Sequence, residues 1–148
     1  MREVSGSTWV FQLMIIFILI FACFLCLVIN YSKAYQVKNE MLSIIEEYEG
    51  VSSTSEEIIN NYLQGNAYLA VGECPAEWYG VRLSDGGYEE ADGQTKYNYC
   101  FIEYQNPNKQ VYYEIIVFYK FNLPFFGDLM TFRVNGVTNS FVGSSNRY

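Results

Sequence analysis

The stretch VFQLMIIFILIFACFLCLVI, from Val10 to Ile29, is apolar at every position except Gln12. A helix rises about 1.5 Å per residue, so roughly 20 such residues cross the hydrocarbon core of a bilayer. Trp9 and Tyr31 stand at its two ends, where amphipathic rings favour the headgroup region. The stretch therefore predicts a transmembrane helix near the N-terminus, and this helix decides the architecture of the rest.

Two other interpretations of this stretch stay open. It could be the buried core helix of a soluble domain, or a cleaved signal peptide with Ser32-Lys33-Ala34 as the cleavage site. The apolar run is longer than the ~7–15 residues of a signal-peptide core. The helical pattern also continues through the would-be cleavage site, which favours an uncleaved anchor.

A stripe of apolar residues extends the helix beyond the membrane. Its members recur at spacings of three and four and so share one helix face: Ala34, Val37, Met41, Ile44 and Tyr48. Charged residues are expected mainly on the other face: Lys38, Glu40, Glu46 and Glu47. Gly50 offers a C-terminal cap, so one helix of about 40 residues is predicted.

Composition and this helix divide the chain into four parts. We expect a short N-terminal tail (1–9), the transmembrane helix (10–29), an amphipathic extension (30–50) and an extracytoplasmic α+β domain (51–148). Aromatic residues make up 18% of the 148, which favours strands in that domain. The net charge of −7 argues against electrostatic binding of nucleic acid or anionic lipid surfaces. Histidine, the commonest general base and transition-metal ligand, is absent.

The four cysteines form two pairs. Cys23 and Cys26 lie inside the membrane stretch, where two thiols without partners make no metal site. Cys74 and Cys100 lie in the domain, and an even pair in an oxidising compartment predicts one disulfide. Two unrelated buried thiols are the alternative.

A short second helix should follow the long one. Ser53 precedes Glu56 by three residues and Thr54 precedes Glu57 by three, the spacing of a capping box. The pattern predicts a helix over 55–63, then strands over 67–71 and 77–83. The glycine-rich stretch 85–94 is expected to be an exposed loop. Its acidic residues do not have the spacing of an EF-hand calcium site: Asp85, Glu89, Glu90 and Asp92.

The strongest β pattern runs from Thr95 to Asn122 around the turn 106–109. Closing Gln105 onto Gln110 predicts that Cys100 pairs with Ile115. Alternate residues of the second strand then form one core face: Val111, Tyr113, Ile115, Val117, Tyr119 and Phe121. Cys100 should share this side and point toward the long helix or toward the segment that carries Cys74.

A last strand is expected over 129–141, after a break at Pro124 and Gly127. Three aromatic residues near this break, Phe121, Phe125 and Phe126, could form a contact patch. Equally, they could close the core where it meets the helix.

The overall plan resembles that of type IV pilin-like proteins, and more closely the TadE/TadG-like pseudopilins of tight-adherence pili. The residues that carry the resemblance are Gly6-Ser7-Thr8 before the apolar run, the passage from Asn30 to Glu40 after it, and the segment from Tyr119 to Thr138. The resemblance implies a pilin-like fold and prepilin-peptidase cleavage after Gly6. Counted from such a cut, the fifth and sixth residues are Phe11 and Gln12, whereas the family places a glutamate there.

The leading hypothesis is a non-catalytic, membrane-anchored pseudopilin or accessory subunit of a pilus-like assembly. Its expected partners are the membrane and pilin-like or other pilus-assembly proteins, including copies of itself, with Gln12 as the helix-packing candidate. The alternative is a membrane-tethered extracytoplasmic binding or sensor module. No catalytic pair, phosphate-binding glycine loop or metal cluster is evident, and no cofactor, nucleic acid or small-molecule substrate is expected. The expected location is the cell membrane, single-pass, with a cytoplasmic N-terminus.

Overall fold

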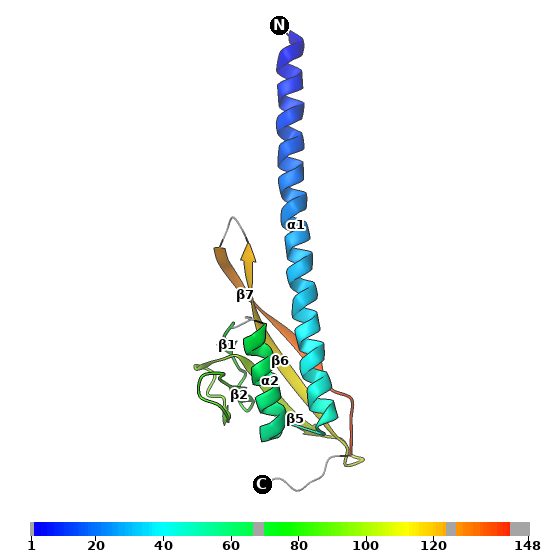
Figure 1. Cartoon of the computed structure of the whole chain (residues 1–148), viewed down its shortest axis with the longest axis vertical. Coiled ribbons are helices and arrows are strands. Elements are labelled where there is room, and N and C mark those ends of the chain that lie inside the picture. Colours follow the sequence, from blue (N-terminus) through cyan, green and yellow to red (C-terminus); the bar gives the residue numbers. More distant parts are fainter. Residues whose placement is uncertain (1, 67–69, 124–126, 143–148) are drawn as a thin grey trace.

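The protein has an α+β fold in which one long helix carries a small β domain (Figure 1). The computed structural model describes residues 2–66, 70–123 and 127–142. Helix α1 spans Arg2–Glu47. Its N-terminal half stands clear of the domain, and its C-terminal half lies along the sheet (Figure 1). The predicted long helix, short second helix and antiparallel sheet are all present.

The predicted apolar stripe of α1 is buried against the sheet over most of its length. Ala34, Val37, Met41 and Ile44 are all buried, and Met41 is fully enclosed. Tyr48 was expected to continue the stripe, but it is exposed because the helix has ended at Glu47.

The helix end is closed as predicted near Gly50, although Glu49 takes the left-handed position. Glu49 has φ 53°, and the Gly50 N–H donates to the Ile45 carbonyl at 2.9 Å. This bond satisfies one of the carbonyls that a helix end leaves unpaired.

The second helix, α2 (Ser53–Gly65), begins earlier and is capped differently than predicted. Ser52 is the N-cap, and its capping-box partner is Ser55, whose Oγ accepts from the Ser52 N–H at 2.7 Å. Glu56 is instead buried and accepts from the Gly87 N–H, so it connects α2 to the turn that precedes Tyr88. The structure therefore uses neither predicted cap, Ser53 with Glu56 or Thr54 with Glu57.

The main sheet has five antiparallel strands in the order β3-β2-β5-β6-β7. Their bounds are β2 Tyr79–Val81, β3 Tyr88–Glu90, β5 Tyr99–Gln105, β6 Val111–Leu123 and β7 Gly127–Val137. A second sheet pairs β1 (Gly72–Glu73) with β4 (Lys96–Tyr97). The stretch predicted as an exposed loop, 85–94, contains the edge strand β3, all of which is exposed. Of the strand predicted over 67–71, residues 70–71 are not in a strand and the others lie outside the described residues.

The predicted register of the central hairpin is wrong by one residue. Gln105 pairs with Val111, and Cys100 pairs with Ile116. The loop holds five residues instead of four because Lys109 adopts φ 61° and its N–H donates to the Asn106 carbonyl. A shift of one residue moves a side chain to the other face of a sheet. Cys100 therefore lies on the face opposite α1.

Two cores result, one on each face of the sheet. The face that carries Tyr113, Ile115, Val117 and Tyr119 packs against α1 and α2, as predicted for this strand. The other face holds a smaller core covered by β1, β4 and their loops. Its buried residues are Ala70, Cys74, Ala91, Tyr97, Cys100, Ile116 and Phe118.

Candidate functional site

The largest unpartnered surface of the described chain is the N-terminal half of α1. This helix is long and apolar enough to cross a membrane, and none of its most apolar window is buried. Its large apolar side chains are mostly more than half exposed; Phe17, for example, is 69% exposed. Apolar surface of this extent requires either lipid or a partner.

Between residues 10 and 30, the polar residues and both cysteines of α1 fall on a single stripe. Gln12, Cys23, Cys26 and Asn30 are joined by successive steps of three or four residues through Ile16 and Leu19. At 100° per residue, these six positions occupy an arc of about 80°. Small and polar residues allow close approach and hydrogen bonding between membrane helices. We call these six residues the polar stripe.

The opposite side of α1 differs in chemistry. Between residues 10 and 30 it carries only large apolar residues, which suit contact with lipid chains. They are Val10, Leu13, Met14, Phe17, Ile18, Phe21, Phe24, Leu25 and Val28. The helix therefore has one face for lipid and one face with the features of a helix–helix contact.

Sequence reasoning identified Gln12 but missed the rest of the polar stripe. Cys23 and Cys26 were considered only as thiols, and Asn30 only as part of the family-like passage. The spacing of four and three residues was present in the sequence and could have joined them. Within the described residues, the Asn30 amide donates to the Cys26 carbonyl at 2.9 Å.

The polar stripe continues directly into the buried stripe of α1. Ala34 follows Asn30 by four residues, and its carbonyl accepts a hydrogen bond from the buried Tyr119 hydroxyl at 2.7 Å. Gly136 of β7 lies against Leu42 and Lys38, so closely that an added Cβ would lie 2.9 Å from each side chain. The sheet is thus held at a defined height relative to the membrane stretch.

Lys38 departs from its predicted place on the exposed face. It is 7% exposed, and its Nζ lies 3.8 Å from the centre of the Tyr35 ring. The long aliphatic stem packs near Gly136 while the ammonium group meets an aromatic face.

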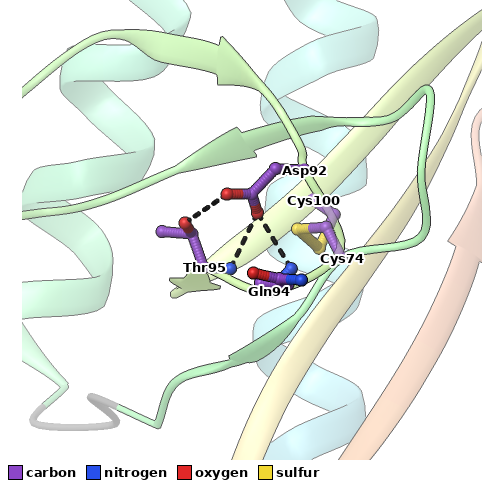
Figure 2. The surroundings of a disulfide bond; sticks show 5 residues. All are labelled: Cys74, Asp92, Gln94, Thr95 and Cys100. Carbon is purple, nitrogen blue, oxygen red and sulfur yellow. Dashed lines mark hydrogen bonds between the residues drawn. A yellow bond between two sulfur atoms is a disulfide. The ribbon is translucent and has the colours of Figure 1, made fainter.

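The predicted pair of domain cysteines meets in the smaller core. Cys74 and Cys100 are joined by a disulfide, with Cα atoms 5.8 Å apart and both residues buried (Figure 2). Of the two directions left open for Cys100, the structure selects the segment that carries Cys74. The bond connects the small sheet to the main sheet on the face away from the helices.

An exposed turn lies beside this disulfide (Figure 2). The carboxylate of Asp92 accepts from the backbone N–H groups of Gln94 and Thr95, at 2.9 and 2.8 Å, and from the Thr95 hydroxyl. These hydrogen bonds, that of the Thr95 N–H first, lower the pKa of Asp92 to about 2. The turn is a closed local structure, and its carboxylate is engaged by its own backbone.

The chemistry available to the domain is limited. Among the residues that the structure describes, no group of three or more Cys, Asp or Glu side chains is placed to hold a metal ion. The candidate patch of three phenylalanines is not addressed: the side chain of Phe121 and all of Phe125 and Phe126 lie outside the described residues.

Comparison of the chain with protein-family models, with curated proteins and with solved structures gives no match. The class of the protein therefore rests on its architecture: an α+β domain mounted on a single helix that is long and apolar enough to span a membrane.

Proposed function

We propose that the protein is a non-catalytic, membrane-anchored subunit of a pilus-like assembly, similar in role to a TadE-like pseudopilin. The polar stripe is the observation that carries the proposal. It gives the exposed half of α1 one face suited to contact other helices, while the same helix carries the domain. In a fibre or its membrane precursor, helices would pack through this face and the β domain would provide specificity for partners.

The proposal includes an orientation. The N-terminus lies in the cytoplasm and the domain lies outside, where a disulfide between Cys74 and Cys100 can persist. A cysteine at Lys109, in the exposed β5–β6 turn, tests this in cells. An impermeant thiol reagent should label it without permeabilisation. Labelling only after permeabilisation would show that the domain lies in the cytoplasm and contradict the proposed orientation.

A site-specific photocrosslinker tests the helix contact. Leu19 belongs to the polar stripe, and Phe17 lies at nearly the same depth on the lipid-facing side, about 160° away. In intact cells, a crosslinker at Leu19 should capture a second copy or a pilin-like protein, whereas one at Phe17 should capture only lipid.

The alternative is a tethered binding or sensor module, in which α1 is only an anchor. Its support is the exposed edge strand β3, whose outer backbone groups could pair with a strand of another protein. Absence of protein crosslinks from both Leu19 and Phe17 would favour this alternative.

A further inference from the structure

Three exposed basic residues of this acidic protein lie toward the end of the domain that is nearest the membrane stretch. The chain has nine lysines and arginines against sixteen acidic residues. Lys33 on α1, Lys120 on β6 and Arg133 on β7 are all exposed. The register pairs Lys120 with Thr131 and Phe118 with Arg133, so the two basic residues are diagonal neighbours on the outer face of the hairpin.

The height of this group follows from the contact between β6 and α1. The Tyr119 hydroxyl bonds the Ala34 carbonyl, so Lys120 and Lys33 stand at nearly the same level. Ala34 comes five residues after Ile29, which is about 7.5 Å along the helix. That distance places the basic group at the headgroup layer, which adds roughly 5–7 Å to each side of the hydrocarbon core.

Strand β6 crosses α1 obliquely and runs toward the N-terminal half of the helix (Figure 1). From Tyr119 to Ile115, the partner of Gly136, the strand covers about 13 Å. From Ala34 to Leu42, which lies against Gly136, the helix covers about 12 Å. The two lengths are similar, so β6 advances along α1, toward the N-terminal half of the helix, between these two contacts.

The hairpin backbone therefore continues to the membrane boundary. From Tyr119 the strand continues for four more residues to Leu123 and covers at most another ~13 Å, which brings its end to about the level at which the apolar stretch of α1 ends near Ile29. Figure 1 shows β6 and β7 extending past the rest of the domain beside α1. Asp128 is the one acidic residue of β7, and it lies at this end, paired with Asn122. Lys33, Lys120 and Arg133 outnumber it.

We propose that Lys33, Lys120 and Arg133 bind the phosphate groups of anionic phospholipids in the leaflet from which the domain emerges. The β6–β7 hairpin then lies against the bilayer as a second contact beside α1. The net charge of −7 does not describe the local charge of this surface, because most of the acidic residues lie in the other parts of the domain. The inference depends on α1 crossing the membrane and does not depend on assembly into a pilus.

Full-length protein in vesicles tests the proposal. A fluorophore on a cysteine at the exposed Thr131, with Cys23 and Cys26 replaced by alanine, reports proximity to spin-labelled lipid headgroups through quenching. Quenching should be strong in vesicles rich in phosphatidylglycerol and weak in phosphatidylcholine alone. Added salt should reduce it. Removing each basic charge should lower the ratio of bound to released domain about fivefold, as expected for about 1 kcal/mol per residue.

Matched variants separate local charge from net charge. Lys120→Glu should reduce quenching, and Lys120→Arg should retain it. Lys109→Glu makes the same charge change in the β5–β6 turn at the far end of the strand and should leave quenching unchanged. Equal thermal midpoints would show that the variants are folded. Equal quenching in both lipids, or equal loss in Lys109→Glu and Lys120→Glu, would overturn the proposal. Quenching that follows protein density instead of lipid charge would overturn it in favour of contact with a second copy.

Discussion

Removing the disulfide should destabilise the domain by an amount that the chain-entropy model provides. Cys74 and Cys100 are separated by 26 residues. Closing a loop of that length removes about 12 cal/mol/K of entropy from the unfolded chain, or about 3.5 kcal/mol at room temperature. The double change Cys74→Ala and Cys100→Ala should therefore lower the free energy of unfolding by at least this amount. Both sites are buried, so lost packing adds to the effect.

Denaturant unfolding of the full chain in detergent micelles, followed by near-ultraviolet circular dichroism, measures the effect. Reduced parent protein is the matched control, because it lacks the bond but keeps both sulfur atoms in place. It should lose about 3.5 kcal/mol, and the double variant somewhat more. A loss below about 1 kcal/mol in both would refute the reasoning. Alkylation of both thiols in unreduced parent protein would refute the pairing itself.

Three further predictions concern the domain. Gly80→Ala should lower the free energy of unfolding, measured by heat or denaturant, by about 1–3 kcal/mol, because its Cβ would lie 2.4 Å from the Tyr97 ring. The control Gly65→Ala lies in open space at the end of α2 and should be neutral or slightly stabilising. Tyr99→Phe should raise stability by about 1 kcal/mol, because the Tyr99 hydroxyl is buried without a hydrogen-bond partner among the described residues; a loss instead would reveal a partner. The pKa of Asp92 is lowered to about 2. The stability that its ionised carboxylate gives the folded protein is therefore complete above the ordinary carboxyl pKa near 3.8 and is lost as pH falls through 2. An NMR titration midpoint near 4 would contradict the turn geometry.

The elements with clear periodicity could be predicted from sequence. Apolar residues from Val10 to Ile29 and the stripe from Ala34 to Ile44 determine α1, because helix periodicity is a local property. The core face of β6 followed from alternation in the same way. The disulfide followed from the count of cysteines outside the membrane stretch.

The features that depend on one backbone torsion or on tertiary packing could not be predicted. A lysine gives no sign that it will adopt φ 61°, so the loop at Lys109 seemed one residue shorter and Cys100 was placed on the wrong face. The burial of Glu56 depends on a turn more than thirty residues away in sequence. The basic group needs the fold to bring Lys33 and Lys120 to the same level along α1.

The central claim is that the membrane stretch associates through its polar stripe. A side-chain amide in lipid gains about 0.6–2 kcal/mol from a partner helix, so Gln12 favours association but leaves it reversible. Energy transfer between donor- and acceptor-labelled full chains in vesicles, over a range of lipid-to-protein ratios, measures this most directly. The account predicts association in the parent, a several-fold weaker constant for Gln12→Leu, and an unchanged constant for the lipid-facing control Phe17→Leu. A parent that stays monomeric at every ratio, or Gln12→Leu that associates as well as the parent, would contradict it.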